Sequence, residues 1–573
     1  MLLSLLIIIV GGVLALLLYP AVHPSSGMSF EHDAGEMETQ VARMLTHFGL
    51  DRSAHDITAR LVMNNDVVHA VLERYRAPEG YALLRERGNG YSWTMQVREK
   101  DPASVTVSIG QGPDEKQLRR MIAGDLQLAF DMHGKLHRID LPIEDSVRLA
   151  SRSPAAAFRE LRVFLLTRAV PRLLGPISRV ESVPDSLSSA TAFSGITYSM
   201  TRQAYRVDHR FSWTVHDDVL QDSIDVEAEF KGSMLAAFNH TYRSIGDVDA
   251  GGDLTVVNLI EIGVFIALII ILVVAGFRRM RTDEIGFSSA LVVGIGTTIL
   301  FSIYLFLQVF SQMDLDLEAA ASLLIAPVMV GGGITLLWAV SEAVGRETWR
   351  EKFISLDLTM RGHVLHSRVG RSVLEGTAAG VMLLLLALLS AWVVSFSRTV
   401  WMPQESNDAF SWLGTSLPVL FLAGEALISN LAGFAFFVLF LLSLLQQRLR
   451  RSGIVLSAGT IILVAIDLPN IVPVPEALIV QLPVVFLLLL LFYRTDVLTT
   501  LLAMVTFSLL QQGIFMLLPW NTALLDQGML LLALLGGTVL YSMITISTPD
   551  RQLDFEAVAP RFQRHISERQ RLA

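Results

Sequence analysis

Long apolar runs alternate with short polar segments along most of the chain, and one long mixed segment interrupts this pattern. The first apolar run covers residues 2–18, and the mixed segment covers residues 27–252. Nine further apolar runs follow, at residues 257–277, 287–310, 319–340, 373–396, 417–445, 453–471, 477–492, 497–518 and 529–546. Runs of this length are typical of helices that span the hydrocarbon core of a bilayer. The pattern therefore predicts a polytopic α-helical membrane protein with about ten transmembrane helices.

The first apolar run predicts an uncleaved transmembrane anchor at residues 1–22. No Lys or Arg precedes the run, and the following sequence YPAVHPSSG has no clear small-x-small cleavage site. A secretory signal peptide has both features. Pro20 and Pro24 end the helix, because a proline cannot continue the backbone hydrogen bonding of a helix interior.

Residues 23–253 predict an α+β domain inserted between the first two membrane helices. Apolar residues at helical spacing predict helices at residues 36–50, 51–61 and 155–170. Alternating residues predict strand segments at residues 91–97, 104–110, 126–141, 198–215 and 223–242. Turns at His133-Gly134 and Lys231-Gly232 divide two of these segments into hairpins.

Two sets of elements in this domain resemble each other, which suggests a diverged duplication. YSWTMQV resembles FSWTV, and AFDMHGKLHRI resembles AEFKGSMLAAF. Each half would place one helix on a small antiparallel sheet and bury one face of that sheet. Its exposed edge strands suit the binding of a peptide by strand addition. The alternative is a spacer domain without a ligand.

Basic residues occur in alternate loops and predict the orientation. They cluster at residues 278–281, 341–372 and 446–451, at Arg494 and in the tail 548–573, whereas the loop 311–318 is acidic. Lys and Arg concentrate in cytoplasmic loops. The prediction is therefore a multi-pass protein of the bacterial cytoplasmic (inner) membrane, with both termini in the cytoplasm and residues 23–253 outside it.

The basic segment 341–372 separates three membrane helices in residues 254–340 from a membrane core of about six helices in residues 373–547. Apolar residues recur in it at spacings of four, three and four, at Trp349, Phe353, Leu356 and Met360. This pattern predicts a cytoplasmic amphipathic helix in the membrane interface, with its rings in the membrane and its charges outside. It would serve as a collar around the bundle or as a docking surface for a cytoplasmic partner.

Composition agrees with a membrane protein. The 573 residues are 52% hydrophobic and 17% charged, and the mean hydropathy is +0.50. The sequence contains no cysteine, which excludes disulfides, thiolate zinc sites and cysteine nucleophiles. The formal net charge is −9 and no basic domain is present, so nucleic acid is not an expected partner.

Three stretches of the chain resemble the CPBP family of intramembrane proteases, which are related to CAAX-prenyl endopeptidases and bacteriocin-processing proteins. They are AYRVDHRFSWTV, SEAVGRETWREKFISLDLTMRGHVLHSRVGRSVLEG and FVLFLLSLLQQRLRRSGIVLSAGTIILVAIDLPNIVPVP. They look most like a long bacterial branch with an extracytoplasmic domain ahead of the membrane core. The resemblance implies the fold of that core at residues 373–547.

The family's chemistry requires a pair of glutamates followed by an arginine on one helix, and histidines on later helices. This sequence departs from that pattern. The glutamate-pair position reads LAGFAFFVL at residues 431–439, and Asp467 stands at a histidine position. No histidine occurs between His366 and His565. The residues therefore indicate that the family's catalytic motifs are degenerate, and they predict no cofactor or metal site.

Glu425 and Asp467 are the remaining candidate catalytic residues. A carboxyl group in hydrocarbon is costly and is functional by default, but Glu425 has a structural alternative as interhelical glue. Its expected partners are then Asn430, Gln511 or Gln512. Asp467 is expected at the outer end of its helix, where water reaches it.

Two histidine pairs and two glycine clusters are weaker candidates. His363 and His366 form an H-x-x-H without convincing further ligands, and His133 and His137 are expected to be surface residues. Clusters of adjacent glycines allow close helix packing or a broken helix, at Gly331, Gly332 and Gly333 and at Gly536 and Gly537.

Three functions remain open. The favoured one is a catalytically inactive protein that scaffolds or binds another membrane or envelope protein, with the lipid bilayer as its other contact. The second is an active intramembrane protease with an unorthodox site at Glu425 and Asp467. The third is a transporter or permease component.

Overall fold

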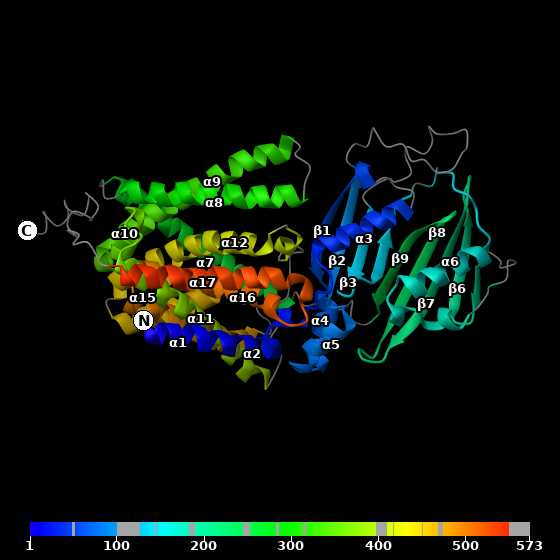
Figure 1. Ribbon diagram of the computed structural model, residues 1–573, viewed down its shortest axis with the longest axis horizontal. Coiled ribbons are helices and arrows are strands. Elements are labelled where there is room, and N and C mark those ends of the chain that lie inside the picture. Colours follow the sequence, from blue (N-terminus) through cyan, green and yellow to red (C-terminus); the bar gives the residue numbers. More distant parts are fainter. Residues whose placement is uncertain are drawn as a thin grey trace, which may run out of the picture.

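The computed structural model has two connected parts, a helical bundle and an antiparallel sheet domain (Figure 1). The sheet and its helices, called the β domain below, lie at one end of the bundle. We call this the proximal end of the bundle and the opposite end the distal end. The described residues are 1–47, 52–99, 126–143, 145, 147–180, 183, 190–243, 252–281, 286–312, 317–396, 410–415, 417–449, 451–467 and 474–548.

Every predicted apolar run overlaps a helix. Among the described residues, nine helical segments are long and apolar enough to cross a membrane, and α14 (Ser452–Asp467) is a shorter apolar helix. The N-terminal segment comprises α1 (Leu2–Leu6), η1 (Ile7–Gly11) and α2 (Gly12–Val22). The others are α7 (Gly252–Met280), α8 (Phe287–Gln312), α9 (Leu317–Thr348), α11 (Ser367–Ser395), α12 to α13 (Pro418–Gly433, Phe434–Leu441, Leu442–Leu449), α15 (Val474–Arg494), α16 (Val497–Gly513) and α17 (Leu525–Ser547). The coarse prediction of a helical membrane protein agrees with these segments.

Helix α11 is the centre of the bundle and packs against α2, α15, α16 and α17. Its glycines permit the closest of these approaches. A Cβ at Gly376 would lie 2.7 Å from the backbone oxygen of Thr499, and one at Gly380 would lie 2.6 Å from Cβ of Thr506. Small residues bring the backbones of α11 and α16 together, as is common in membrane bundles.

Helices α8 and α9 interlock in the same way. A Cβ at Gly331 of α9 would lie 1.9 Å from Oγ1 of Thr298 in α8. The prediction of close packing is therefore confirmed at Gly331. A Cβ at Gly332 or Gly333 would meet no atom within 4 Å, and the same holds for the pair at residues 536 and 537. Neither cluster breaks its helix.

The long run that begins at Pro418 is one continuous helical rod. The sequence leaves open a re-entrant break at Gly433. Instead, the α-helix α12 changes there to a π-helix, η10 (Phe434–Leu441), which continues into α13. The π-helical hydrogen bonds widen the turns without interrupting the rod.

The segment 341–372 does not form one interfacial helix. Its first part extends α9, and the rest forms η8 (Arg350–Phe353), α10 (Ile354–Met360) and the start of α11. Phe353 and Leu356 are buried in the bundle core. The prediction of outward charges is wrong for Glu342, Arg346 and Asp357, which are buried as well, because they neutralise one another.

The β domain contains one nine-stranded antiparallel sheet in the order β1-β2-β3-β4-β9-β8-β7-β6-β5. One face is covered by α3 (Ala34–His47), which contacts β1 and β2, and by α6 (Pro154–Thr167), whose phenylalanines pack on β7 and β9. Two further helices are α4 (Asn65–Arg74) and α5 (Glu79–Arg87). The strands are β1 (His55–Met63), β2 (Tyr91–Glu99), β3 (Leu126–Asp131), β4 (Leu136–Asp140), β5 (Ala190–Phe193), β6 (Ile196–Arg202), β7 (Val207–Asp217), β8 (Asp222–Lys231) and β9 (Met234–Tyr242).

The two halves of the sheet meet where β4 pairs with β9. Ile139 pairs with Phe238 there, and both hairpins that contain these residues have a bulge just before a phenylalanine, Phe130 or Phe230. The hairpin match therefore agrees with an approximate two-fold relation. The segments YSWT and FSWT do not pair in equivalent registers with the two hairpins. Trp93 pairs with Phe130, whereas the equivalent Phe230 pairs with His209. An evolutionary duplication stays a prediction.

One predicted helix in this domain is wrong. The sequence predicts a helix at residues 51–61, but His55–Met63 is the edge strand β1. Ile57, Ala59 and Leu61 alternate into the core, and the whole strand pairs with β2, so period-two burial prevails. The predicted strand at residues 104–110 lies outside the described residues, and α4 and α5 are absent from the sequence-based predictions.

Candidate functional site

Glu425 lies two turns into α12, on the side that faces α8. Its side chain is half-buried. Tyr304 of α8 packs its ring 4.1 Å from that of Phe421, one turn before Glu425. A Cβ at Gly424 would also meet Tyr304, at 3.9 Å. Glu425 therefore lies near the contact between α8 and α12, beside an aromatic hydroxyl-bearing residue.

The interhelical bond expected of Glu425 is made by its neighbour instead. Asn430 Nδ2 donates to the backbone oxygen of Ala426 at 2.7 Å and to Ser508 Oγ of α16 at 2.9 Å. Among the described contacts, no hydrogen bond joins Glu425 to Asn430, Gln511 or Gln512. Asn430, rather than Glu425, therefore joins α12 to α16.

The structure places Glu425 and Asp467 on two different helices, α12 and α14. Asp467 is the last residue of α14, and its side chain lies outside the description. Helix α12 packs mainly on α8, α16 and η10, whereas α14 packs on α7, α13 and α15. The two carboxylates are thus carried by helices with different neighbours.

The position that the CPBP resemblance assigns to a glutamate pair is apolar core. Phe434, Ala435, Val438 and Leu439 are all buried there. The ring of Phe434 lies 6.2 Å from that of Phe492 in α15. This stretch of η10 supplies packing and no acid or base.

In the described residues, neither histidine pair belongs to a larger cluster of potential metal ligands. No group of three or more potential metal-ligating side chains occurs in the described part of the chain. His363 is exposed, and His366 accepts the backbone N–H of Arg368 at 3.1 Å, so it caps α11. His133 and His137, which are expected to be surface residues, are both intermediate in exposure.

His137 lies on the covered face of the sheet, beside His240. Their rings are 5.4 Å apart and roughly perpendicular. Burial, with the nearby charge of Arg172, lowers the pKa of His240 to about 4, and burial likewise lowers the pKa of His137. Both imidazoles are therefore neutral at neutral pH. Arg172 donates to the backbone oxygen of Arg87 at 3.3 Å, which places its charge in the same cluster.

A buried ionic network at the distal end of the bundle is absent from the sequence-based predictions. Arg346 donates through Nε to Glu342 Oε1 at 2.6 Å and through both terminal nitrogens to the carboxylate of Asp357. Glu342 also accepts from Ser289 Oγ at 2.6 Å and from Trp338 Nε1 at 3.0 Å. The side chains of Glu342 and Arg346 are only 2% and 3% exposed. Such a fully bonded network stabilises one arrangement of α8, α9 and α10.

One signal for this network is present in the sequence. Glu342 and Arg346 are four residues apart immediately after an apolar run, which is the spacing of a helical ion pair. The same spacing is common on exposed helices. Only the turn through η8, which returns Asp357 to Arg346, shows that the pair is buried.

A second feature that the sequence does not reveal is the joint between the β domain and the bundle. The backbone N–H of Phe30 donates to Oδ1 of the fully buried Asn521 at 3.0 Å. Asn521 Nδ2 donates to the backbone oxygen of Phe515 at 2.7 Å, and Ala523 N–H donates to that of Phe30 at 3.3 Å. The segment after α2 is therefore bonded to the turn between α16 and α17.

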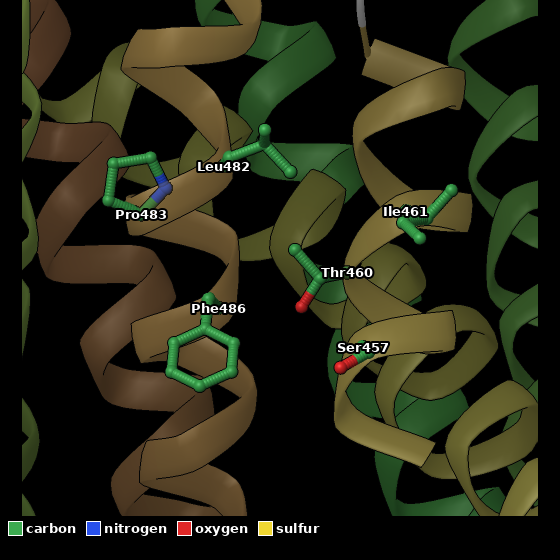
Figure 2. A pocket seen from close by; sticks show the side chains of 6 residues that line it. All are labelled: Ser457, Thr460, Ile461, Leu482, Pro483 and Phe486. Carbon is green, nitrogen blue, oxygen red and sulfur yellow. The ribbon is translucent and has the colours of Figure 1, made fainter. Parts of the chain in front are cut away.

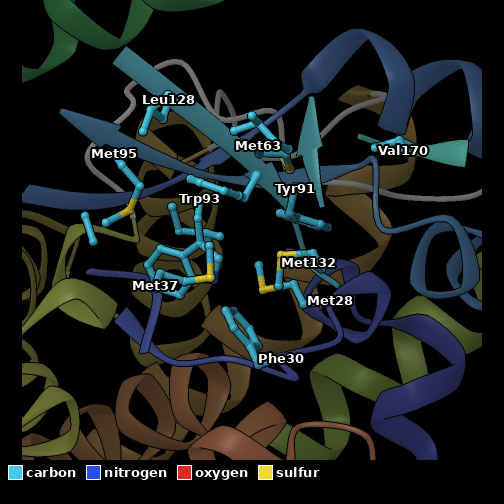
Figure 3. Packing of buried hydrophobic residues seen from close by; sticks show 14 of the residues in the cluster. Met28, Phe30, Met37, Met63, Tyr91, Trp93, Met95, Leu128, Met132 and Val170 are labelled. Atoms are coloured by element: carbon cyan, nitrogen blue, oxygen red, sulfur yellow. The ribbon is translucent and has the colours of Figure 1, made fainter. Parts of the chain in front are cut away.

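The ring of Phe30 bridges the two parts of the protein. It lies 5.9 Å from Trp93 of β2 and 5.9 Å from Phe515 of the bundle. Figure 3 shows Phe30 below Trp93, Met37 and Met28, with the sheet above them. The β domain and the proximal end of the bundle thus share one continuous hydrophobic core.

The side chains of Arg85 and His133 strengthen this joint. Arg85 of α5 donates to the backbone oxygen of Ser26 at 2.6 Å and stacks on the ring of Trp520 at 4.1 Å. His133 lies between Glu31 Oε1, 2.7 Å from Nδ1, and the backbone oxygen of Arg85, 3.1 Å from Nε2. Burial alone would lower the pKa of His133, but the hydrogen bond and charge of Glu31 raise it above its usual value.

Comparison with known proteins identifies no relative, because no family model, curated protein or solved structure matches the chain. The resemblance to the CPBP family therefore stays a prediction.

Proposed function

We propose that the protein is a non-catalytic membrane scaffold, which holds its β domain in a fixed orientation for binding another membrane or envelope protein. The observation that carries this proposal is the joint at Phe30 and Asn521. A domain tethered only by flexible linkers would not share a buried core and a fully bonded asparagine with the membrane bundle. Fixed presentation reduces the entropy that a partner must overcome on binding.

The proposed topology places the β domain outside the cytoplasm of a bacterial cell. The distal end carries Arg279, which donates to the backbone oxygen of Ala343, and the exposed Arg361 and Arg494. Basic residues at one end of a membrane bundle favour the cytoplasmic side for that end. The bundle is then a ten-helix anchor with both termini in the cytoplasm.

The apolar packing at residues 431–439 supports a scaffold rather than a CPBP-type enzyme. Acid–base chemistry inside a membrane needs polar groups that bind a water molecule or a metal, and buried phenylalanines do not provide them. We propose that the chain has an intramembrane-protease-like core without the activity.

We propose that the partner contacts the β domain at two exposed apolar side chains of α6. Val163 and Leu166 lie one turn apart on the outer side of α6, and each is 56% exposed. Exposed apolar residues on a domain outside the membrane suit a protein contact. Thr241 is exposed on the opposite face of the sheet and provides a matched control position.

Site-specific photo-cross-linking in intact membranes tests this function. We expect a photoreactive side chain at Leu166 to give one discrete protein adduct and the same group at Thr241 to give none. The adduct should persist when Glu425→Gln and Asp467→Asn are introduced. Equal labelling from both positions would contradict a defined partner surface.

Glu425 supports the alternative of an active intramembrane enzyme, because its carboxyl group lies in the membrane bundle beside Tyr304. Glu425→Gln could abolish a cellular phenotype while the protein stays folded and the Leu166 adduct is retained. That result would favour the active enzyme and contradict the scaffold. If the protein is a scaffold, variants that keep the Leu166 adduct should keep the phenotype, and variants that lose the adduct should lose it.

A further inference from the structure

A groove runs between α14 and α15 on the surface of the bundle. It is lined by Ser457, Thr460 and Ile461 from α14 and by Leu482, Pro483 and Phe486 from α15, and it has a volume of about 350 Å³. Figure 2 shows these six side chains, three from each helix. Ile461 is 65% exposed and Phe486 is 42% exposed, so the groove is open to the surroundings of the bundle.

The walls of the groove suit a hydrocarbon chain. Pro483 lies inside α15 and cannot donate the hydrogen bond that would keep the helix regular. The hydroxyl of Thr460 donates to the backbone oxygen of Leu456 at 2.8 Å and is satisfied within its own helix. Ile461 of α14 lies across the groove from Leu482 and Phe486 of α15, so the groove offers a large apolar contact to an alkyl chain.

Two arginines stand at one end of this groove. Arg451 precedes α14, and Arg494 is the last residue of α15. At a rise of about 1.5 Å per residue, they lie on the order of 9 and 12 Å along their helices from Ser457 and Phe486. Both are exposed, and neither forms an ion pair with another described residue. Their guanidinium groups are available to an anion at the distal membrane surface.

We propose that this groove binds one acyl chain of an anionic phospholipid, whose phosphate lies between Arg451 and Arg494. The apolar walls select a lipid over a free anion, because inorganic phosphate has no group to place beside Leu482 and Phe486. The arginines select an anionic lipid over a zwitterionic one, because basic residues at a membrane surface attract anionic headgroups. The site is independent of the proposed scaffold function.

Native mass spectrometry of the full-length protein in detergent tests the site. The probes are phosphatidylglycerol and phosphatidylcholine with identical acyl chains, each added in increasing amounts. We expect phosphatidylglycerol to bind more tightly. Replacing both arginines (Arg451→Gln with Arg494→Gln) should weaken its binding about 30-fold, the effect of two basic residues near an anionic surface, and should leave phosphatidylcholine unchanged.

Two further variants separate the groove from general surface charge. Ser457→Phe fills the groove and should weaken the binding of both lipids. Arg361→Gln removes an exposed charge after α10, which packs on α11 and α16 rather than on the groove helices, and should change neither.

Three results would overturn the proposal. Equal affinity for the two lipids would show that the arginines do not select the headgroup. Displacement of phosphatidylglycerol by millimolar inorganic phosphate would indicate a free-anion site. A dimer that Ser457→Phe converts to a monomer would show that a second copy of the chain, rather than a lipid, covers the groove.

Discussion

The buried network of Arg346 gives the sharpest prediction of stability. Replacing Arg346 with methionine (Arg346→Met) keeps an unbranched but shorter side chain and removes the cation that bonds both Glu342 and Asp357. Two carboxylates would then remain in a site that is nearly closed to water. We expect the bundle to be strongly destabilised.

The magnitude follows from the contacts. Removing one partner of a buried ion pair costs about 3–5 kcal/mol, because the other charge is left uncompensated. Arg346→Lys keeps the charge but loses the planar fork, so its cost should be smaller, about 1.5–3 kcal/mol for a lost hydrogen bond between charged groups. Adding Glu342→Gln and Asp357→Asn to Arg346→Met removes the stranded charges and should recover most of the loss.

Unfolding by titration with sodium dodecyl sulfate in mixed micelles measures these differences. Tryptophan fluorescence is a suitable signal, because Trp338 donates a hydrogen bond to Glu342 within the network. The control is Glu347→Gln on the same helix. Glu347 pairs with Arg279 but is 59% exposed, so its loss should cost only about 0–1 kcal/mol.

If the unfolding free energies of Arg346→Met and Glu347→Gln are equal within error, the buried network does not stabilise the bundle as proposed. A triple variant as unstable as Arg346→Met alone would show that uncompensated charge does not cause the destabilisation.

Two other predictions concern helix packing and pH. Gly331→Ala should separate α8 from α9 and lower the unfolding free energy, because the new Cβ would clash with Thr298, whereas Gly332→Ala in the same helix has room. Disulfide trapping of cysteine pairs between α8 and α9 measures the separation. Equal trapping in the two variants would contradict the close packing at Gly331. The β domain should lose stability as the pH falls below about 6.5 towards 4, because the unfolded chain protonates His240 more readily than the folded chain, whose pKa is about 4. His240→Gln should flatten this dependence in hydrogen-exchange measurements, and an unchanged slope would contradict the assignment.

The membrane helices are predictable because hydrocarbon imposes one requirement on every span. A long apolar run satisfies its backbone polar groups only as a helix, so the run that forms α11 is recognisable without any knowledge of its neighbours. The hairpin turns at Gly134 and Gly232 are also predictable, because tight turns favour glycine at positions with positive φ. The φ values of these two glycines are 72° and 58°.

The features that the sequence does not predict all depend on contacts between residues that are far apart in the chain. Asn521 reads as a polar residue in a turn between two apolar runs, and its role depends on Phe30, 491 positions away. Residues 55–63 fit either a helix or a strand until β2 pairs with them. Asn430 and Glu425 are equally plausible as interhelical glue by sequence, and only the position of Ser508 on α16 favours Asn430.

A distance measurement across the joint tests the central claim that the β domain is held in a fixed orientation on the bundle. The chain contains no cysteine, so spin labels at Thr241→Cys in β9 and Leu525→Cys in α17 would be the only ones, and double electron–electron resonance in nanodiscs reports their separation. We predict one narrow distribution for the otherwise unchanged protein and a broad one when Asn521→Ala and Phe30→Ala are added. A distribution that is already broad without these two substitutions would contradict the fixed scaffold.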